Sequence, residues 1–127
     1  MPNLNDLIDG YVAGDDLCVQ RQISGIPSEA PVVSAWFTVR DLDDFTASSI
    51  ITQLQISTTS TLSGQIIDTG ASTGIAHVKF DLDKVRTRLI GIVGYPWDIQ
   101  IKLSDLRINT PYRGTIEAAA EVTQVTS

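Results

Sequence analysis

The sequence has one cysteine, one histidine and few basic side chains. Cys18 has no partner in the chain, so no intramolecular disulfide can form, and one histidine cannot build a Cys and His cluster for zinc. Nine Lys and Arg stand against 15 Asp and Glu, which gives a formal charge of −6, and the basic residues are scattered. Contacts to phosphates need a concentrated positive face, so we expect no nucleic-acid partner. Since the chain has no Cys and His cluster, we also expect no metal, and we expect no cofactor.

Long apolar runs are also missing. The longest, from Leu89 to Trp97, is too short to span a bilayer, and the first residues, MPNLNDLIDGY, contain neither a basic side chain nor the apolar centre of a signal peptide. We therefore expect no membrane partner, and synthesis as a soluble cytoplasmic protein without a secretion signal. With 127 residues, of which 43% are hydrophobic, the chain is long enough to bury one core.

What the sequence does contain is alternation of apolar and polar residues with a period of two, which predicts strands. Strands are expected over residues 17–23, 31–40, 50–56, 65–68, 75–80, 95–103, 107–110 and 115–123. Arg21 interrupts the apolar face of the first of these, which is typical of an edge strand. In the second, Val33 and Phe37 are expected to face the core and Trp36 the opposite side.

The remaining segments complete a fold prediction. Asp83 is expected to cap a single helical turn over residues 83–89, with Val85 and Leu89 on one face, that bridges two sheets. Turn signals separate the short strands, and amphipathic helices are lacking. The predicted fold class is all-β, an immunoglobulin-like β-sandwich of about seven short, mainly antiparallel strands with one short helical turn. The last strand should bury Ile116, Ala118, Ala120 and Val122.

We divide the chain into an N-terminal arm, residues 1–11, and one sandwich domain, residues 12–127. Four apolar residues of the arm are more than a small domain can cover by itself. These candidate protein-binding anchors are Leu4, Leu7, Ile8 and Tyr11. We expect the domain to fold without the arm, and assembly to depend on it.

Two motifs resemble catalytic elements. The run from Ile66 to Ser72, with Asp68-Thr69-Gly70 at its centre, is similar to the catalytic loop of retropepsin-type aspartic proteases, in which two such loops share a proton. That family needs an apolar strand and a glycine-containing element about sixty residues later, and the chain ends first. The alternative is an ordinary hairpin turn.

The second motif runs from Val78 to Val85 and is similar to the nucleophile strand of haloacid-dehalogenase phosphatases, with Asp81 and Asp83 one residue apart. That fold needs a larger α/β domain, so we interpret Asp83 as a helix cap. We expect no catalytic residue in the chain.

Three other features invite a binding interpretation. The acidic run Asp41, Asp43 and Asp44 lacks the glycine and glutamate of an EF-hand loop, so it is interpreted as a solvated loop. His77 alternates onto a polar strand face and is expected at the surface. Trp36 is the candidate platform for a sugar ring.

A family resemblance comes from the order and spacing of several segments. They are Gly14-Asp15-Asp16-Leu17, then Arg21-Gln22-Ile23-Ser24-Gly25-Ile26-Pro27, then Ala35-Trp36-Phe37-Thr38-Val39-Arg40, with Gly64 to Gly74, Tyr95 to Lys102 and Thr110 to Ile116 later. Together, over residues 11–123, they resemble the immunoglobulin-like domain of phage baseplate-upper-protein-type virion proteins. The usual turn glycine is absent from Ser104-Asp105-Leu106-Arg107, and the long second region of those proteins is missing.

The resemblance implies a bacteriophage virion structural protein, an assembly or attachment module of the tail, baseplate or fibre apparatus. Its implied partners are other virion proteins, with a homo-oligomer in a symmetric particle and the virion as its location. A free-standing domain of this type could instead decorate a capsid, in contact with the major capsid protein. Two further alternatives are a carbohydrate-binding module and, on Asp68, a retropepsin-like protease.

Overall fold

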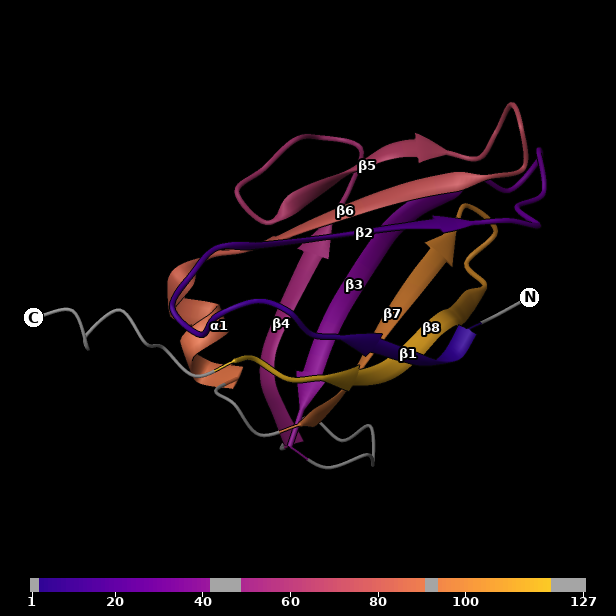
Figure 1. Cartoon of the computed structure of the whole chain (residues 1–127). Coiled ribbons are helices and arrows are strands. Elements are labelled where there is room, and N and C mark those ends of the chain that lie inside the picture. Colours follow the sequence, from indigo (N-terminus) through magenta and orange to yellow (C-terminus); the bar gives the residue numbers. More distant parts are fainter. Residues whose placement is uncertain (1–2, 42–48, 91–93, 120–127) are drawn as a thin grey trace, which may run out of the picture.

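The computed structural model describes residues 3–41, 49–90 and 94–119, which form two packed β-sheets and one short helix (Figure 1). The predicted all-β sandwich is confirmed. Strands of the smaller sheet run across those of the larger one, and the apolar core lies between them (Figure 1). No helix within the described ranges is long and apolar enough to cross a membrane.

The larger sheet has five strands in the order β1-β8-β7-β3-β4. Their bounds are β1 (Asn3–Ile8), β8 (Ile108–Ile116), β7 (Tyr95–Leu103), β3 (Val32–Arg40) and β4 (Ile50–Ile56). All neighbours are antiparallel except β1 and β8, which are parallel. β7 has the predicted bounds, and Trp97, Ile99 and Ile101 from its apolar face are buried because that face covers the core.

The smaller sheet has three antiparallel strands in the order β2-β6-β5. Their bounds are β2 (Leu17–Ile23), β6 (Ala76–Leu82) and β5 (Gly64–Thr69). Ala76, Val78 and Phe80 are buried, as the alternation of β6 predicts. β2 is an edge strand of this sheet, which confirms the interpretation of Arg21.

The helix α1 (Lys84–Ile90) follows β6 and packs against both β6 and β4, so it bridges the two sheets as predicted. The Asp83 carboxylate accepts a 2.9 Å hydrogen bond from the Arg86 N–H, which is the expected N-cap. The helix is buried through Thr87 and Ile90, whereas the face with Val85 and Leu89 is exposed.

Two strand details differ from the sequence-based expectation. Val33 is exposed and Val32 is buried. The pairing of β3 with β7 shifts register between Val32 and Ser34, so the alternation of inward and outward side chains is reversed at the start of the strand. The segments 107–110 and 115–123, predicted as separate strands, are joined in β8, which continues through Pro111. Ile116 and Ala118 are buried as expected, and Ala120 and Val122 lie outside the described residues.

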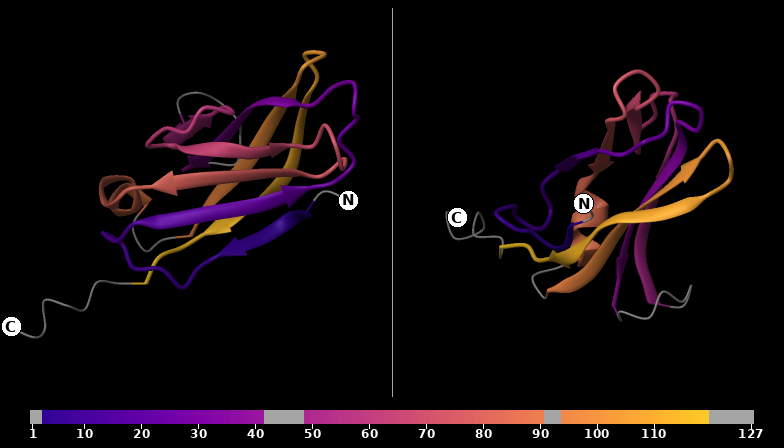
Figure 2. Two further views of the ribbon diagram at one scale, coloured as in Figure 1. Left: turned by 90° about the horizontal axis from the view of Figure 1, so that it is seen from above. Right: turned by 90° about the vertical axis from the view of Figure 1, so that its right-hand side faces the viewer.

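The N-terminal segment is a strand of the sandwich, where the sequence predicted an arm. β1 pairs with β8 from Asn3, opposite Tyr112, to Ile8, opposite Ile116, and raises the number of strands in the described part of the chain to eight. Its alternation is obscured in the sequence because the pairing is irregular between Asn3 and Asp6. Figure 2 shows β1 at the rim of the molecule, beside β2.

Candidate functional site

The four candidate anchors of residues 1–11 divide into two pairs. Ile8 and Tyr11 are buried and belong to the domain's own core, so this domain covers half of the apolar residues that we expected a partner to cover. Leu4 and Leu7 are 58% and 54% exposed. We call the surface formed by Leu4, Leu7 and the outward backbone of β1 the β1 edge.

β1 is held to the rest of the sandwich by an ion pair across the seam between the sheets. Arg21 of β2 donates two hydrogen bonds to Asp6 of β1, from Nε to Oδ2 at 2.9 Å and from Nη2 to Oδ1 at 3.3 Å. The same guanidinium lies 5.7 Å from the ring centroid of Trp97 and 5.8 Å from that of Tyr112. The basic residue that interrupts an apolar face therefore joins the two sheets.

Gly114 of β8 makes the close approach of β1 possible. A Cβ atom at this position would stand 1.5 Å from the backbone oxygen of Asp6, a distance that no side chain tolerates. At the end of β1 the Glu117 N–H donates to the Ile8 carbonyl at 3.0 Å, and beyond β1 the chain still runs beside this segment, where Val12 forms a parallel bridge with Ala119. The close pairing of β1 with β8 therefore requires glycine at position 114.

Tyr11 is the buried titratable group of this region. Its hydroxyl has no hydrogen-bond partner among the described residues. Burial raises the pKa of Tyr11 to about 12, because the phenolate would lose its hydration. The backbone carbonyl of Tyr11 accepts from the Ala119 N–H at 2.8 Å, so the residue anchors the segment by main chain and ring together.

The free edges of β1 and β2 lie at the same seam but differ in their backbone chemistry. On β2, the Gln20 carbonyl accepts from Arg21 Nη1 at 2.7 Å, and the Gln22 carbonyl accepts from the Tyr112 hydroxyl at 2.6 Å. On β1, the bond from Glu117 to Ile8 shows that Ile8 faces β8, so alternation points the backbone of Leu7 away from the sheet. Side chains cap the β2 edge, and the β1 edge is flanked by two exposed leucines.

Trp36 lies on the outer face of the larger sheet and is half-buried. Its cross-strand neighbours are Gln55 on β4 and Gln100 on β7. An indole between two amides offers a ring face and planar hydrogen-bonding groups on one surface. The sequence placed Trp36 on the side opposite the core, and the structure adds the two amides.

The retropepsin-like motif forms the end of a hairpin. Asp68 is exposed, and its Oδ1 accepts a hydrogen bond from the Gly70 N–H at 2.8 Å, while Gly70 has a positive φ of 84°. A carboxylate that bonds the backbone two residues on is the geometry of the turn interpretation. The second motif is equally local: Asp83 caps α1 and Asp81 pairs with Lys79 at 3.6 Å.

The other candidate binding residues do not converge. His77 is on the outer face of β6, where its Nε2 lies 2.8 Å from the Gln20 side-chain oxygen. Asp41 is exposed at the end of β3, and Asp43 and Asp44 lie outside the described residues. Within residues 3–41, 49–90 and 94–119, no three His, Cys, Asp or Glu side chains are grouped so that they could hold a metal ion.

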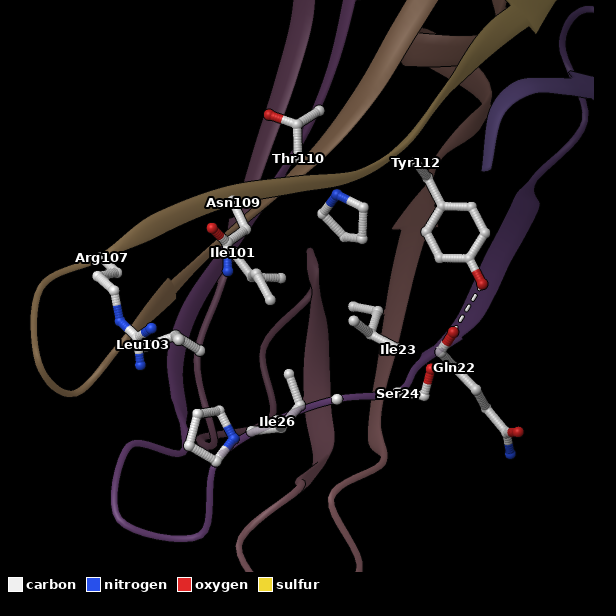
Figure 3. Close-up of a pocket in the computed structure, with 13 residues that line it drawn as sticks. Gln22, Ile23, Ser24, Ile26, Ile101, Leu103, Arg107, Asn109, Thr110 and Tyr112 are labelled. Atoms are coloured by element: carbon white, nitrogen blue, oxygen red, sulfur yellow. Dashed lines mark hydrogen bonds between the residues drawn. The ribbon is translucent and has the colours of Figure 1, made fainter. Parts of the chain in front are cut away.

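A cleft at the same seam was not predicted from the sequence (Figure 3). It has a volume of about 420 Å³, within the roughly 300–1,000 Å³ of small-ligand sites. Its walls are the segment after β2 and the first half of β8. The lining residues are Gln22, Ile23, Ser24, Gly25, Ile26, Pro27, Ile101, Leu103, Arg107, Asn109, Thr110, Pro111 and Tyr112.

Comparison with known proteins adds no assignment. No protein-family model matches the sequence, and a search of curated proteins finds no significant match. The contacts of the β1 edge, of Trp36 and of the cleft are therefore the observations on which a function can be proposed.

Proposed function

We propose that the chain is a bacteriophage virion structural protein, an assembly or attachment module of the tail, baseplate or fibre apparatus. The observation that carries the proposal is the β1 edge: an edge strand of the larger sheet, held by Asp6 and Gly114, whose outward side presents Leu4 and Leu7 to solvent. An edge strand with unshielded apolar residues is a template for pairing with another chain.

The charge distribution supports pairing at this edge. The protein carries a formal charge of −6, which opposes close contact between acidic surfaces. On β1, however, Asp6 is engaged by Arg21, and the exposed residues Asn3, Leu4, Asn5 and Leu7 are uncharged. A partner strand of a neighbouring virion protein, or of another copy in a symmetric particle, can approach without charge repulsion.

The test is incorporation into particles. We would replace the wild-type gene with Leu4→Lys/Leu7→Lys and measure the copy number in purified, fractionated particles by quantitative mass spectrometry. Both side chains are exposed, so the fold is retained and incorporation falls by about tenfold or more. The matched control is Val85→Lys/Leu89→Lys, which charges another exposed apolar pair, on α1, and leaves incorporation unchanged.

The distribution between fractions tests the location. Enrichment with tails at low copy supports attachment to tail, baseplate or fibre, and enrichment with heads at high copy supports capsid decoration in its place. Absence of the wild-type chain from both fractions contradicts the virion proposal.

A carbohydrate-binding module is the second candidate, because Trp36 stands between Gln55 and Gln100 on an exposed sheet face. A glycan array probed with the wild type and with Trp36→Ala tests it, since stacking of a sugar requires the indole. Binding that is lost in Trp36→Ala supports this role, and an array without any signal removes it.

A further inference from the structure

We infer that the cleft between the end of β2 and the first half of β8 binds an extended peptide of a partner protein, which adds as a short strand to β8. The inference rests on the cleft and on the backbone of β8, and it is independent of the β1 edge. Its partner chemistry is a strand segment with an apolar side chain at alternate positions.

The first observation is an uncovered stretch of strand edge. β1 begins to pair with β8 at Tyr112, and no described residue pairs with residues 108–111 on that side. β8 is therefore flanked by β7 along its whole length but by β1 along only its second half. The remaining half is a strand edge that faces the cleft.

The second observation identifies the backbone groups at this edge. The Arg107 carbonyl accepts from the Leu103 N–H at 2.9 Å, and Asn109 stands opposite Ile101 on β7. Arg107 and Asn109 therefore direct their backbone toward β7, and alternation turns the backbone of Ile108 to the open side, before the pairing of β7 with β8 becomes irregular between Asn109 and Tyr112. Thr110 lines the cleft, and Figure 3 shows its side chain pointing away from the other labelled lining residues.

The third observation is the apolar floor of the cleft. Ile23 and Ile26 from the smaller sheet's side meet Ile101 and Leu103 of β7, and all four are buried members of the core. A side chain that entered between the sheets would bury apolar surface against these residues. The space beside Gly25, which has a φ of 78°, is open, since a Cβ there would meet nothing within 4 Å.

The fourth observation limits the ligand. The Tyr112 hydroxyl bonded to the Gln22 carbonyl closes the cleft toward β1, so a strand can occupy only the four-residue stretch before Tyr112. Arg107 is paired with Asp105 at 2.7 Å, which leaves no unbalanced charge to select a strongly acidic or basic partner. A short, uncharged, extended segment fits both limits.

The experiment uses blocked five-residue peptides in which threonine alternates with valine, isoleucine, leucine or phenylalanine. They are titrated into the isotope-labelled full chain, and backbone amide shifts are followed by NMR. We expect saturable shifts at Ser24, Gly25, Asn109 and Thr110, with a dissociation constant in the millimolar range. The same peptides with N-methylated amides cannot pair as strands, so their dissociation constants should be higher by about tenfold or more.

Two substitutions test the location. Asn109→Trp and Ser24→Trp each fill the cleft from one exposed wall position, and both should abolish the shifts; the second serves if the first fails to fold. Gln53→Trp, at an exposed strand position on β4, is the matched control and retains binding. Absence of saturable shifts with every peptide, or equal binding of the N-methylated set, would overturn the inference. Particle incorporation of the β1 variant is measured separately, so the two failures are distinguishable.

Discussion

The two free edges at the seam of the sandwich, β1 and β2, show how differently one molecule can treat exposed strand backbone. On β2 the outward carbonyls of Gln20 and Gln22 are occupied by Arg21 and by the Tyr112 hydroxyl. On β1 the same arginine binds the Asp6 side chain and does not cap the outward backbone of the strand. Arg21 thus caps a backbone carbonyl on the β2 edge and holds β1 in place with its outward edge open. We therefore expect the β1 edge, and not the β2 edge, to pair with a partner.

The largest effect in this comparison should come from Gly114→Ala. The added Cβ overlaps the Asp6 backbone oxygen, so β1 must leave β8 and the burial of Ile8 is lost. We expect the free energy of unfolding to fall by about 3 kcal/mol in urea denaturation. Gly94→Ala is the control, because its Cβ would meet only side-chain atoms, the Thr115 methyl at 3.2 Å and Glu117 Oε2 at 3.5 Å, and should cost less than about 1 kcal/mol. Equal losses in both variants would contradict the requirement for glycine at position 114.

Arg21→Met should cost about 2 kcal/mol, because it removes a two-point ion pair and leaves Asp6 partly buried without its cation. Arg107→Met breaks the exposed pair with Asp105 and should cost less than about 0.5 kcal/mol. Both values come from chemical denaturation at neutral pH. If the two variants are equally stable, the ion pair does not hold β1.

Tyr11 gives the comparison a pH dependence. Its pKa is raised to about 12 in the folded state, above the usual value of 10.0, so the unfolded state loses the proton first. Stability from this group is therefore complete below pH 10 and is lost between pH 10 and 12, by at most about 1.4 kcal/mol per pH unit. The free energy of unfolding from pH 8 to 12 should fall more steeply for the wild type than for Tyr11→Phe. Parallel curves would contradict the prediction.

Tyr112→Phe sharpens the comparison from the β2 side. It removes the hydroxyl that caps the Gln22 carbonyl and should lower stability by about 1 kcal/mol. With that cap absent, the β2 edge becomes more like the β1 edge, so self-association measured by sedimentation should increase. Tyr95→Phe, at a half-buried position of β7 opposite Ile116, is the control and should remain as monodisperse as the wild type.

The smallest effect is expected at Asp68, far from either edge. Asparagine can make the same turn bond to the Gly70 N–H, so Asp68→Asn should change stability by less than about 0.5 kcal/mol. A peptide-cleavage assay with both proteins addresses the protease alternative. Cleavage by the wild type that disappears in Asp68→Asn would revive that alternative.

Strands that bury one face in the core and expose the other could be predicted from the sequence. β6 and β7 alternate in sequence because each buries one face on the core, although Asp98 on the opposite face of β7 is buried as well, and Asp83 marks the start of the helix that follows β6. The prediction for Val33 was wrong, because a register shift is a property of the pairing and leaves no mark in composition. β8 continues through Pro111, a position where the sequence indicated a break.

The candidate sites were predictable only where one segment contains the signal. Leu4 and Leu7 were found as apolar residues near the terminus, but the pairing of Asp6 with Arg21 joins segments that only the fold brings together. The cleft combines residues 22–27 with residues 101–112, and each segment alone is an ordinary strand end. A site that forms where two sheets meet can be predicted only when the order and pairing of the strands are known.

The parallel pairing of β1 with β8 also has a consequence for the order of folding. β1 cannot pair until β8 has been made, since Asn3 pairs with Tyr112. On the ribosome, residues 3–8 emerge early and stay unpaired until nearly the whole domain has been made, and closing so long a loop is slow. During that interval an apolar terminal segment is open to chaperones or to neighbouring chains. The yield of correctly closed protein therefore depends on how long β1 stays unpaired during synthesis.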